Sequence, residues 1–371
     1  MGVGAIRSTQ LTSPRMLKQR LLDQISAGSA MPFEEFMEAA LYDPEHGFFS
    51  SDELRSVKSG DFLTSPEVSP MFGETLASFV AAERDRVGEP FALIEAGAGS
   101  GSLLKPLLEA IEPRPDAWAV EASPAARTAL LDVLPPQRVV ASLGELPGPM
   151  RGVIIANEMV DNLPMSLAVR NGDGWEERWV GVDGDSLELV ARPARSEVAT
   201  WCDSFGGKVP EGGMVEVQLA ATRWVATALS VLSAGALVII DYGGTAEELE
   251  PRRTMGTLRT YRAHHLGPDP LDEPGATDIT ADVNFSALVS IAEESGATVE
   301  LHRQDDFLSG WGLRERLADL RAHELELAKG DDAIARLQVR SQVTDIETLL
   351  HPRGLGDFRV MVARLGNSPS Q

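Results

Sequence analysis

The stretch that most constrains this chain is residues 91–104, FALIEAGAGSGSLL. A short apolar run ends at the acid Glu95 and opens directly into three glycines, Gly97, Gly99 and Gly101. This pattern indicates a buried strand followed by a tight turn, because glycine adopts backbone conformations that a Cβ atom forbids. The missing side chains also allow a ligand to contact bare backbone. The sequence therefore predicts a strand, a ligand-binding turn and a helix in succession.

The spacing of the glycines separates two kinds of nucleoside-binding loop. The dinucleotide-binding pattern G-x-G-x-x-G needs its third glycine at position 102, where this chain has Ser102. The pattern here is G-x-G-x-G, which is typical of class I methyltransferases that bind S-adenosylmethionine (SAM). In this interpretation Glu95 ends the first strand, and the glycines allow close approach of the methionine half of the cofactor. For a glycine loop taken alone, an ordinary turn is the alternative.

A second acid supports nucleoside binding. The run AWAVEAS ends an apolar strand at Glu121, 20 residues after Gly101. At this distance a βαβ unit returns its second strand to the same edge of the sheet, where a carboxylate accepts hydrogen bonds from both ribose hydroxyls in NAD and SAM sites alike. We therefore predict that Glu121 and the adjacent Ala122 bind the cofactor. The alternative is a solvated acid that caps the helix beginning at Ser123-Pro124.

A polar cluster follows a later strand. The run GVIIANEMVDNLP places Asn157, Glu158, Asp161 and Asn162 directly after an apolar segment. In an open α/β sheet, ligands bind beyond the carboxyl ends of the strands. Two acids three residues apart can clamp a guanidinium, or orient an amine for attack on a methyl group and accept its proton. We predict Asn157, Glu158 and Asp161 as catalytic residues, with Asn157 also beside the cofactor; the alternative is an acid pair that caps the next segment.

Alternating strands and helices predict an α/β fold. We expect strands at 91–95, 117–121, 138–141, 152–156 and 236–241, helices at 286–294 and 314–327, and a last strand at 358–365 at the end of the sheet. Between 165 and 192 short antiparallel strands surround an Asn-Gly and an Asp-Gly turn. The fold class is thus a class I methyltransferase, Rossmann-like sheet with an N-terminal helical region and an inserted substrate region. Asp241, at the end of one strand, either lines the site or caps a turn.

Composition restricts the compartment and the partners. The formal net charge of −23 disfavours contacts that neutralise phosphates, so we expect neither nucleic acid nor a membrane surface as partner. Cys202 is the single cysteine, which excludes an internal disulfide and is typical of a reducing compartment. The six histidines show no H-x-x-x-H spacing, so we expect no metal. With no apolar run near the roughly 18 residues of a membrane span, we expect a cytoplasmic protein.

Seven ordered blocks of the sequence are shared with a known family. They are MPFEEFMEAALYDPEHGFFS (31–50), GDFLTSPEVSPMFGE (60–74), EAGAGSG (95–101), NEMVDNLP (157–164), IDYGG (240–244), PGATDITADVNF (274–285) and RQDDFL (303–308). In these blocks the chain resembles the MidA-like, or DUF185, family of mitochondrial complex I assembly methyltransferases and their bacterial relatives. The resemblance implies a class I methyltransferase fold, SAM as cofactor and a lid loop over it, with contacts from Thr64, Ser65, Pro66 and Gly73. For the mitochondrial members it implies methylation of a protein arginine on a subunit of respiratory complex I.

These patterns together divide the chain into parts. They are a loose tail (1–14), N-terminal helices with the cofactor lid loop (15–88), the SAM-binding core (89–164 and 213–371), a β-rich insertion (165–212) and, within the core, a substrate-region loop (243–283). The region 43–75 is rich in Pro, Gly and Ser but carries aromatic residues, which favours an ordered loop over a site rather than a flexible linker.

We therefore expect a SAM-dependent methyltransferase that modifies a protein side chain, with arginine favoured because Glu158 and Asp161 can pair with a guanidinium. A small metabolite is the alternative acceptor, and it fits two departures from the usual family pattern, Pro70 and Asp282. Another alternative is a SAM-binding assembly factor that holds a partner protein without turnover. A dehydrogenase is disfavoured by Ser102. The oligomeric state stays open, a homodimer included.

Overall fold

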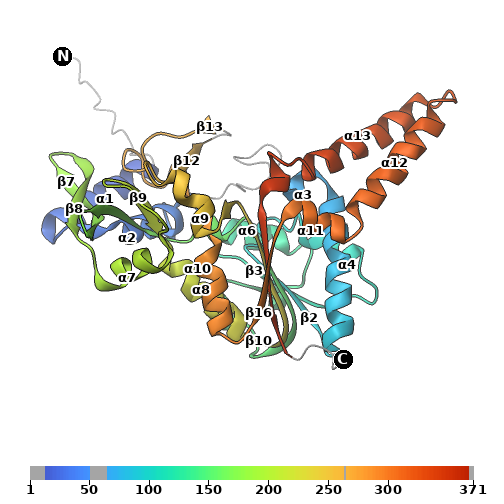
Figure 1. Cartoon of the computed structure of the whole chain (residues 1–371), viewed down its shortest axis with the longest axis horizontal. Helices are drawn as coiled ribbons and strands as arrows, with labels where there is room; N and C mark the ends of the chain where they lie inside the picture. Colours follow the sequence, from blue (N-terminus) through green and yellow to red (C-terminus); the bar gives the residue numbers. More distant parts are fainter. Residues whose placement is uncertain (1–12, 51–64, 263–264, 367–371) are drawn as a thin grey trace, which may run out of the picture.

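The computed structural model describes residues 13–50, 65–262 and 265–366. Their centre is a seven-stranded sheet with the strand order β16-β17-β10-β5-β2-β3-β4 (Figure 1). The strands are β2 (Ala92–Ala96), β3 (Asp116–Val120), β4 (Val139–Val140), β5 (Met150–Asn157), β10 (Leu232–Asp241), β16 (Thr298–Arg303) and β17 (Arg359–Leu365). Neighbours from β4 to β10 are parallel, whereas β17 is antiparallel to both β10 and β16. The carboxyl ends of β2, β3, β5 and β10 therefore meet at one edge.

Apolar side chains make this sheet a buried layer. In the central strand β5, Val153, Ile154 and Ile155 are at most 1% exposed, because a parallel strand covered on both faces needs apolar residues in succession. On one face the core includes residues of α4 (Pro70–Val87), α5 (Leu104–Glu109), α11 (Gln304–Gly310), α12 (Leu313–Leu327) and α13 (Ala333–Leu349). On the other it includes residues of α8 (Leu219–Ser230) and α10 (Phe285–Glu294). In the described part of the chain, no helix has the length and apolarity needed to cross a membrane.

The expected order of strands and helices is largely confirmed. All five strands predicted between 91 and 241 are present, with ends that differ by a few residues, and the helices expected at 286–294 and 314–327 correspond to α10 and α12. The prediction that the last strand lies at the end of the sheet is wrong, since β17 lies between β10 and β16. The edge strand β16 was missed because its sequence, TVELHR, alternates with polar residues and stays partly exposed.

A smaller antiparallel sheet lies beside the main one (Figure 1). Its strands are β1 (Met31–Pro32), β6 (Ser166–Asn171), β7 (Gly174–Asp183), β8 (Ser186–Pro193) and β9 (Met214–Val217). The two predicted turns are confirmed: Gly172 and Gly184 lie at φ 55° and 57° between consecutive strands. Such positive φ values favour glycine in two-residue hairpin turns.

Helices from the N-terminal part of the chain pack on this small sheet. The helices are α1 (Ser13–Ala27) and α2 (Phe33–Tyr42), and Phe33, Phe36 and Leu41 pack in one cluster with Leu167 and Val180 of the sheet. Helix α7 (Ser196–Phe205) covers the opposite face. The segment 15–88 thus contributes to both sheets, since α4 packs on the main one. Residues 1–12 of the expected tail and 51–64 of the expected lid lie outside the described residues.

The segment 243–284 joins the two sheets. It contains β11 (Gly243–Gly244), α9 (Ala246–Leu249), η5 (Glu250–Arg252), β12 (Arg259–Arg262), β13 (His265–Leu266), β14 (Asp278–Thr280) and β15 (Val283–Asn284). A buried ion pair anchors it to β9: Arg253 Nη1 lies 3.0 Å from Glu216 Oε2, and the two side chains are 1% and 2% exposed. Glu216 Oε1 also accepts a hydrogen bond from the backbone N–H of Leu258 at 3.2 Å.

We predict that Arg253→Met lowers the free energy of unfolding by about 3 to 5 kcal/mol, because it leaves the Glu216 carboxylate buried without its counter-charge. Urea unfolding monitored by circular dichroism measures the change. In the double variant Arg253→Met, Glu216→Gln neither member of the pair carries a charge, so part of the loss should be recovered. Equal stability of wild type and Arg253→Met would contradict a structural role for this pair.

Candidate active site

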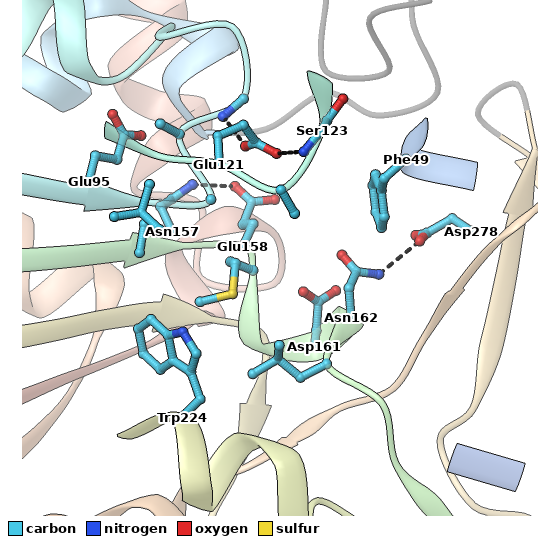
Figure 2. Close-up of a pocket in the computed structure, with 18 of the residues that line it drawn as sticks. Phe49, Glu95, Glu121, Ser123, Asn157, Glu158, Asp161, Asn162, Trp224 and Asp278 are labelled. Carbon is cyan, nitrogen blue, oxygen red and sulfur yellow. Dashed lines mark hydrogen bonds between the residues drawn. The ribbon is translucent and has the colours of Figure 1, made fainter. Parts of the chain in front are cut away.

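A cavity of about 890 Å³ lies at the edge where β2, β3, β5 and β10 end (Figure 2). Its lining begins at the glycine loop after β2 and continues past the polar turn after β5 to α2 and the segment 243–284. The volume is in the range of pockets that enclose a small organic ligand. The topology explains its position, because ligands of open α/β sheets bind beyond the carboxyl ends of the strands.

The glycine loop forms one wall of the cavity. Gly97, Gly99 and Gly101 have φ values of 70°, 51° and 82°, which L side chains rarely adopt. Gly97 and Gly99 line the cavity, and a Cβ at Gly97 would lie 2.5 Å from Met159 Cγ. Gly101 does not line it: a Cβ there would meet Val133 at 3.1 Å. The third glycine therefore permits the turn and the packing behind it.

Glu121 lies at the end of β3 and connects two turns. Its Oε2 accepts a hydrogen bond from the N–H of Gly99 at 2.8 Å, and its Oε1 accepts one from the N–H of Ser123 at 2.7 Å (Figure 2). Ser123 itself is the N-cap of α6 (Pro124–Leu130), because its hydroxyl accepts from the N–H of Ala126. Each carboxylate oxygen keeps a further lone pair for another donor. Both Glu121 and Ala122 line the cavity.

Some buried acceptors in the cavity wall have no hydrogen-bond partner in the described part of the chain, and two of these belong to β2 and β5. They are Glu95 Oε2 and Asn157 Oδ1, on side chains that are 5% and 9% exposed. Burial, followed by the charge of Glu121, holds the pKa of the Glu95 carboxyl well above its usual range. An unsatisfied buried acceptor is costly, so these two atoms fit a ligand that brings N–H donors or positive charge.

Glu158 begins the turn after β5 in a strained conformation. Among the described non-glycine residues it alone has a positive φ, 50°, and such strain is concentrated at functional sites. Its Oε1 accepts hydrogen bonds from the N–H of Ser65 at 3.0 Å and from Asn157 Nδ2 at 3.2 Å. Burial raises the pKa of Glu158 to about 7. The carboxyl group therefore changes its charge near neutral pH.

Asp161 follows three residues later, and within the described part of the chain one of its two carboxylate oxygens accepts hydrogen bonds. Its Oδ2 accepts hydrogen bonds from the hydroxyls of Tyr242 and Thr280, the latter at 2.5 Å, while Oδ1 has no partner among the described residues. Asp241 is fully buried and accepts hydrogen bonds from the N–H groups of Val160 at 3.0 Å and Asp161 at 3.2 Å. Of its two interpretations, the turn cap is confirmed. It does not line the cavity.

Sequence reasoning missed the far wall of the cavity. There Asn162 Nδ2 donates to Asp278 Oδ1 at 2.8 Å (Figure 2). Tyr42 donates to the carbonyl of Asn162 at 3.2 Å. Phe49 lies beside Tyr42, with ring centroids 5.5 Å apart. Tyr42, Phe49 and Asp278 belong to blocks 31–50 and 274–285 of the family resemblance, which was the available signal.

The lid residues named from the resemblance have different positions. Pro66 lines the cavity. Ser65 is buried behind it, where its N–H donates to Glu158 and its hydroxyl accepts from Gln304 at 3.3 Å. Gly73 lies in α4 away from the cavity, and a Cβ there would approach Pro106 at 3.0 Å, so it permits close contact between α4 and α5. Thr64 lies outside the described residues.

Comparison with known proteins shows the family to which the chain belongs. A family model described as "Putative S-adenosyl-L-methionine-dependent methyltransferase" matches residues 72–302. The chain belongs to this methyltransferase family. The methyltransferase is similar to a Burkholderia thailandensis protein whose crystal structure contains S-adenosyl-homocysteine, with 29% identity and a TM-score of 0.85 over 100% of this chain and 96% of that one. A native structure from the same organism matches at 30% identity and a TM-score of 0.81, with the same coverage.

Curated relatives share lower identity over most of their length. The methyltransferase is 27% identical to "Protein arginine methyltransferase NDUFAF7, mitochondrial" of Xenopus tropicalis, over 88% of this chain and 81% of that protein. The human protein of the same name is 26% identical over 91% of this chain and 81% of its own length. These similarities confirm the class I methyltransferase-like α/β fold and SAM as cofactor.

The cavity wall fits this cofactor. Gly97 and Gly99 provide bare backbone, and Glu121 offers two carboxylate oxygens that suit a pair of ribose hydroxyls. The unpartnered atoms of Glu95 and Asn157 suit the ammonium group of a methionine moiety.

We predict that Glu121→Ala weakens SAM binding roughly tenfold to a hundredfold, because two hydrogen bonds to a charged acceptor are lost. Isothermal titration calorimetry measures the dissociation constant. Glu121→Gln is the matched control: it keeps the side-chain size and one acceptor, so its loss should be smaller. An unchanged dissociation constant for Glu121→Ala would remove this residue from the cofactor site.

We also predict a pH-dependent gain of stability in Glu158→Gln. The folded state binds a proton at Glu158 with a pKa of about 7, against the ordinary glutamate pKa of 4.5. Stability contributed by the protonated group is therefore complete below pH 4.5 and is lost as the pH rises through 7. Glutamine stays neutral, so the melting temperature of the variant should exceed that of wild type at pH 8 and match it more closely at pH 5. A difference independent of pH would contradict the raised pKa.

Proposed function

We propose that this methyltransferase transfers the methyl group of SAM to a protein side chain and that arginine is the favoured acceptor. The observation that carries the proposal is the pair Glu158 and Asp161, which lines the cavity directly beyond the glycine loop. Figure 2 shows both carboxylates on the turn after β5, between Glu121 on one side and Asp278 on the other. A guanidinium has the charge and the forked donors that two such carboxylates require.

The cofactor end of the cavity is assigned to the residues near β2 and β3. Gly97 and Gly99 allow approach of the methionine moiety, Glu95 and Asn157 accept from its ammonium group, and Glu121 binds the ribose. The cofactor supplies an electrophilic methyl group on a sulfonium centre. Asn157 then lies between the cofactor residues and Glu158, to which its amide group donates at 3.2 Å.

The acceptor end is assigned to the acids after β5. Asp161 is oriented through Oδ2 by two hydroxyls, which leaves Oδ1 to pair with one guanidinium nitrogen. Glu158 is held through Oε1, so Oε2 is its group for the acceptor. Fixing two nitrogens of the guanidinium orients the third toward the methyl group. The two bound reactants then react as readily as two groups of one molecule would.

Glu158 also suits the proton transfer. A guanidinium nitrogen that gains a methyl group must lose a proton, and a carboxylate with a pKa near 7 accepts and releases it within the working pH range. This assignment requires the ionised form, so turnover should rise as the pH increases through about 7. The printed names of the Xenopus and human relatives, protein arginine methyltransferases, support arginine as the acceptor class.

We predict that Glu158→Gln and Asp161→Asn lower turnover by roughly two to four decades and leave the dissociation constant of SAM nearly unchanged, because each removes positioning and charge at the acceptor only. Turnover is measured as methyl transfer to arginine peptides and to co-purified proteins, with mass spectrometry locating the added methyl group on the residue. Calorimetry on the same samples measures SAM binding.

Three results would contradict the proposal. Full activity of both variants would remove the acids from catalysis. Methylation of a small metabolite but of no protein or peptide would assign the acceptor to the alternative class, and binding of SAM without turnover on any acceptor would favour an assembly factor. A capping role for the acids would instead lower stability by about 0.5 to 2 kcal/mol and leave the rate intact.

A further inference from the structure

Basic side chains also line the cavity, although the chain as a whole carries a formal net charge of −23. We call Arg252, Arg259 and Arg353 the basic rim; all three line the cavity. Their location in so acidic a chain places positive charge at one side of the site. Short-range contacts must account for any role of this rim, because the overall charge of the chain repels anions at longer distance.

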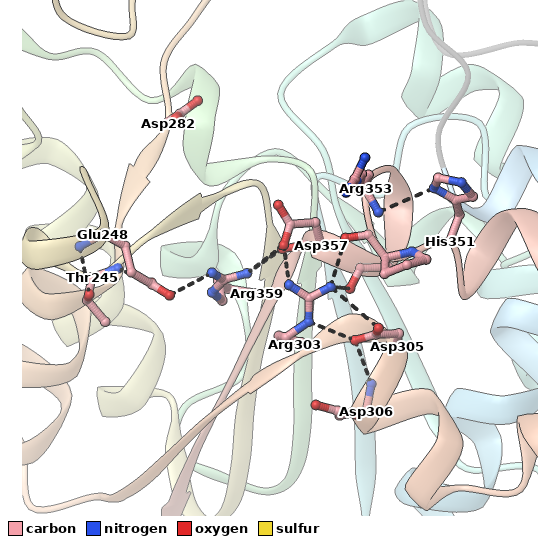
Figure 3. Close-up of polar contacts among 12 residues, drawn as sticks. Thr245, Glu248, Asp282, Arg303, Asp305, Asp306, His351, Arg353, Asp357 and Arg359 are labelled. Atoms are coloured by element: carbon pink, nitrogen blue, oxygen red, sulfur yellow. Dashed lines mark hydrogen bonds and ion pairs between the residues drawn. The ribbon is translucent and has the colours of Figure 1, made fainter. Parts of the chain in front are cut away.

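The described residues neutralise the charge of the rim only in part. Arg252 and Arg259 both pair with the buried carboxylate of Asp282, at 2.5 Å for Arg259 Nη2, so two guanidinium groups share one acid. Arg353 is exposed, and its guanidinium has no hydrogen bond or ion pair within the described part of the chain. Its backbone N–H donates to His351 Nδ1 (Figure 3).

Two neighbouring arginines differ from Arg353, because their guanidinium groups form ion pairs and hydrogen bonds. Arg303 contacts Asp305, Asp357 and two backbone carbonyls, and Arg359 pairs with Glu248 at 2.8 Å (Figure 3). These two arginines hold the start of β17 in place. Arg353 stands apart from that network and is therefore available to a ligand.

The topology puts the basic rim on the acceptor side of the cavity. Arg353 precedes β17, whose first residue, Arg359, lies opposite Asp241 at the end of β10. Between β17 and the glycine loop of β2 lie β10 and β5, which corresponds to three strand spacings, or about 14 Å. Arg252 and Arg259 also follow β10. The rim thus faces the half of the cavity that contains Glu158 and Asp161, and lies away from the proposed cofactor half.

We propose that the basic rim selects acceptor segments in which the cationic residue has acidic neighbours: the acids after β5 take the side chain to be methylated, while Arg353 and Arg252 pair with adjacent carboxylates. The inference rests on the proposed function and specifies its substrate. Arginine suits this role, since its planar fork binds a carboxylate through two parallel hydrogen bonds. Arg353 is a specificity residue in this scheme and does not contact the reacting atoms.

The test uses three synthetic peptides, each with one central arginine flanked by aspartates, by serines or by lysines. The full-length enzyme with saturating SAM should show kcat/KM highest for the aspartate peptide, on the order of fivefold above the serine peptide, with the lysine peptide lowest. Fluorescence anisotropy of labelled peptides, in the presence of S-adenosylhomocysteine, should give the same order of affinity without turnover. Arg353→Glu should abolish or invert both orders.

Arg340→Glu is the matched control, because Arg340 is also exposed but lies on α13 and does not line the cavity; it should keep the wild-type order. If Arg353→Glu keeps the wild-type order of the three peptides, or if the wild type shows no preference among them, the inference is overturned and the proposed function still stands. The inference is also overturned if Arg353→Glu loses as much SAM affinity as turnover. That result would mean that Arg353 binds the carboxylate of the cofactor. No methylation and no binding of any peptide would contradict the proposed function and this inference with it.

Discussion

The carboxylate of Asp241 fixes the segment on which the whole site depends. It is buried at the end of β10 and accepts hydrogen bonds from the backbone N–H groups of Val160, Asp161 and Tyr242. These donors belong to the turns that follow two adjacent strands, so one side chain joins both strand ends. Without it three buried N–H groups would lack an acceptor, and the turn that carries Glu158 and Asp161 would lose its position.

The ionised acids of the site lower the stability of the fold. Burial raises the pKa of Glu95, Glu158, Asp161 and Asp241, which means that their ionised forms cost stability. Positive ligand groups relieve this cost, and the methyltransferase cofactor brings both a sulfonium and an ammonium group. Binding energy and relief of charge repulsion therefore act in the same direction, and the site becomes more stable when it is occupied.

The sequence predicted what depends on local pattern. The glycine spacing and the acid at Glu121 located a turn and a strand end that line the cavity, because both are encoded by neighbouring residues. It did not predict the far wall, since Tyr42, Phe49 and Asp278 come together only through the packing of distant segments. Gly73 shows the opposite error: a glycine in a family block was interpreted as a ligand contact, whereas in the structure it permits two helices to touch.

The pairing of β1 with β7 has a consequence for how the chain folds. The small sheet needs Met31 and Pro32 beside Val180 and Trp179, residues separated by almost 150 positions. Helices α1 and α2 bury their apolar faces on that sheet and on the segment 243–284, which comes later still in the chain. During synthesis the apolar surface of these helices therefore stays exposed until the insertion has left the ribosome. Contacts of such long sequence separation form late, so the N-terminal helices are the region most exposed to chaperones and to aggregation while the chain is being made.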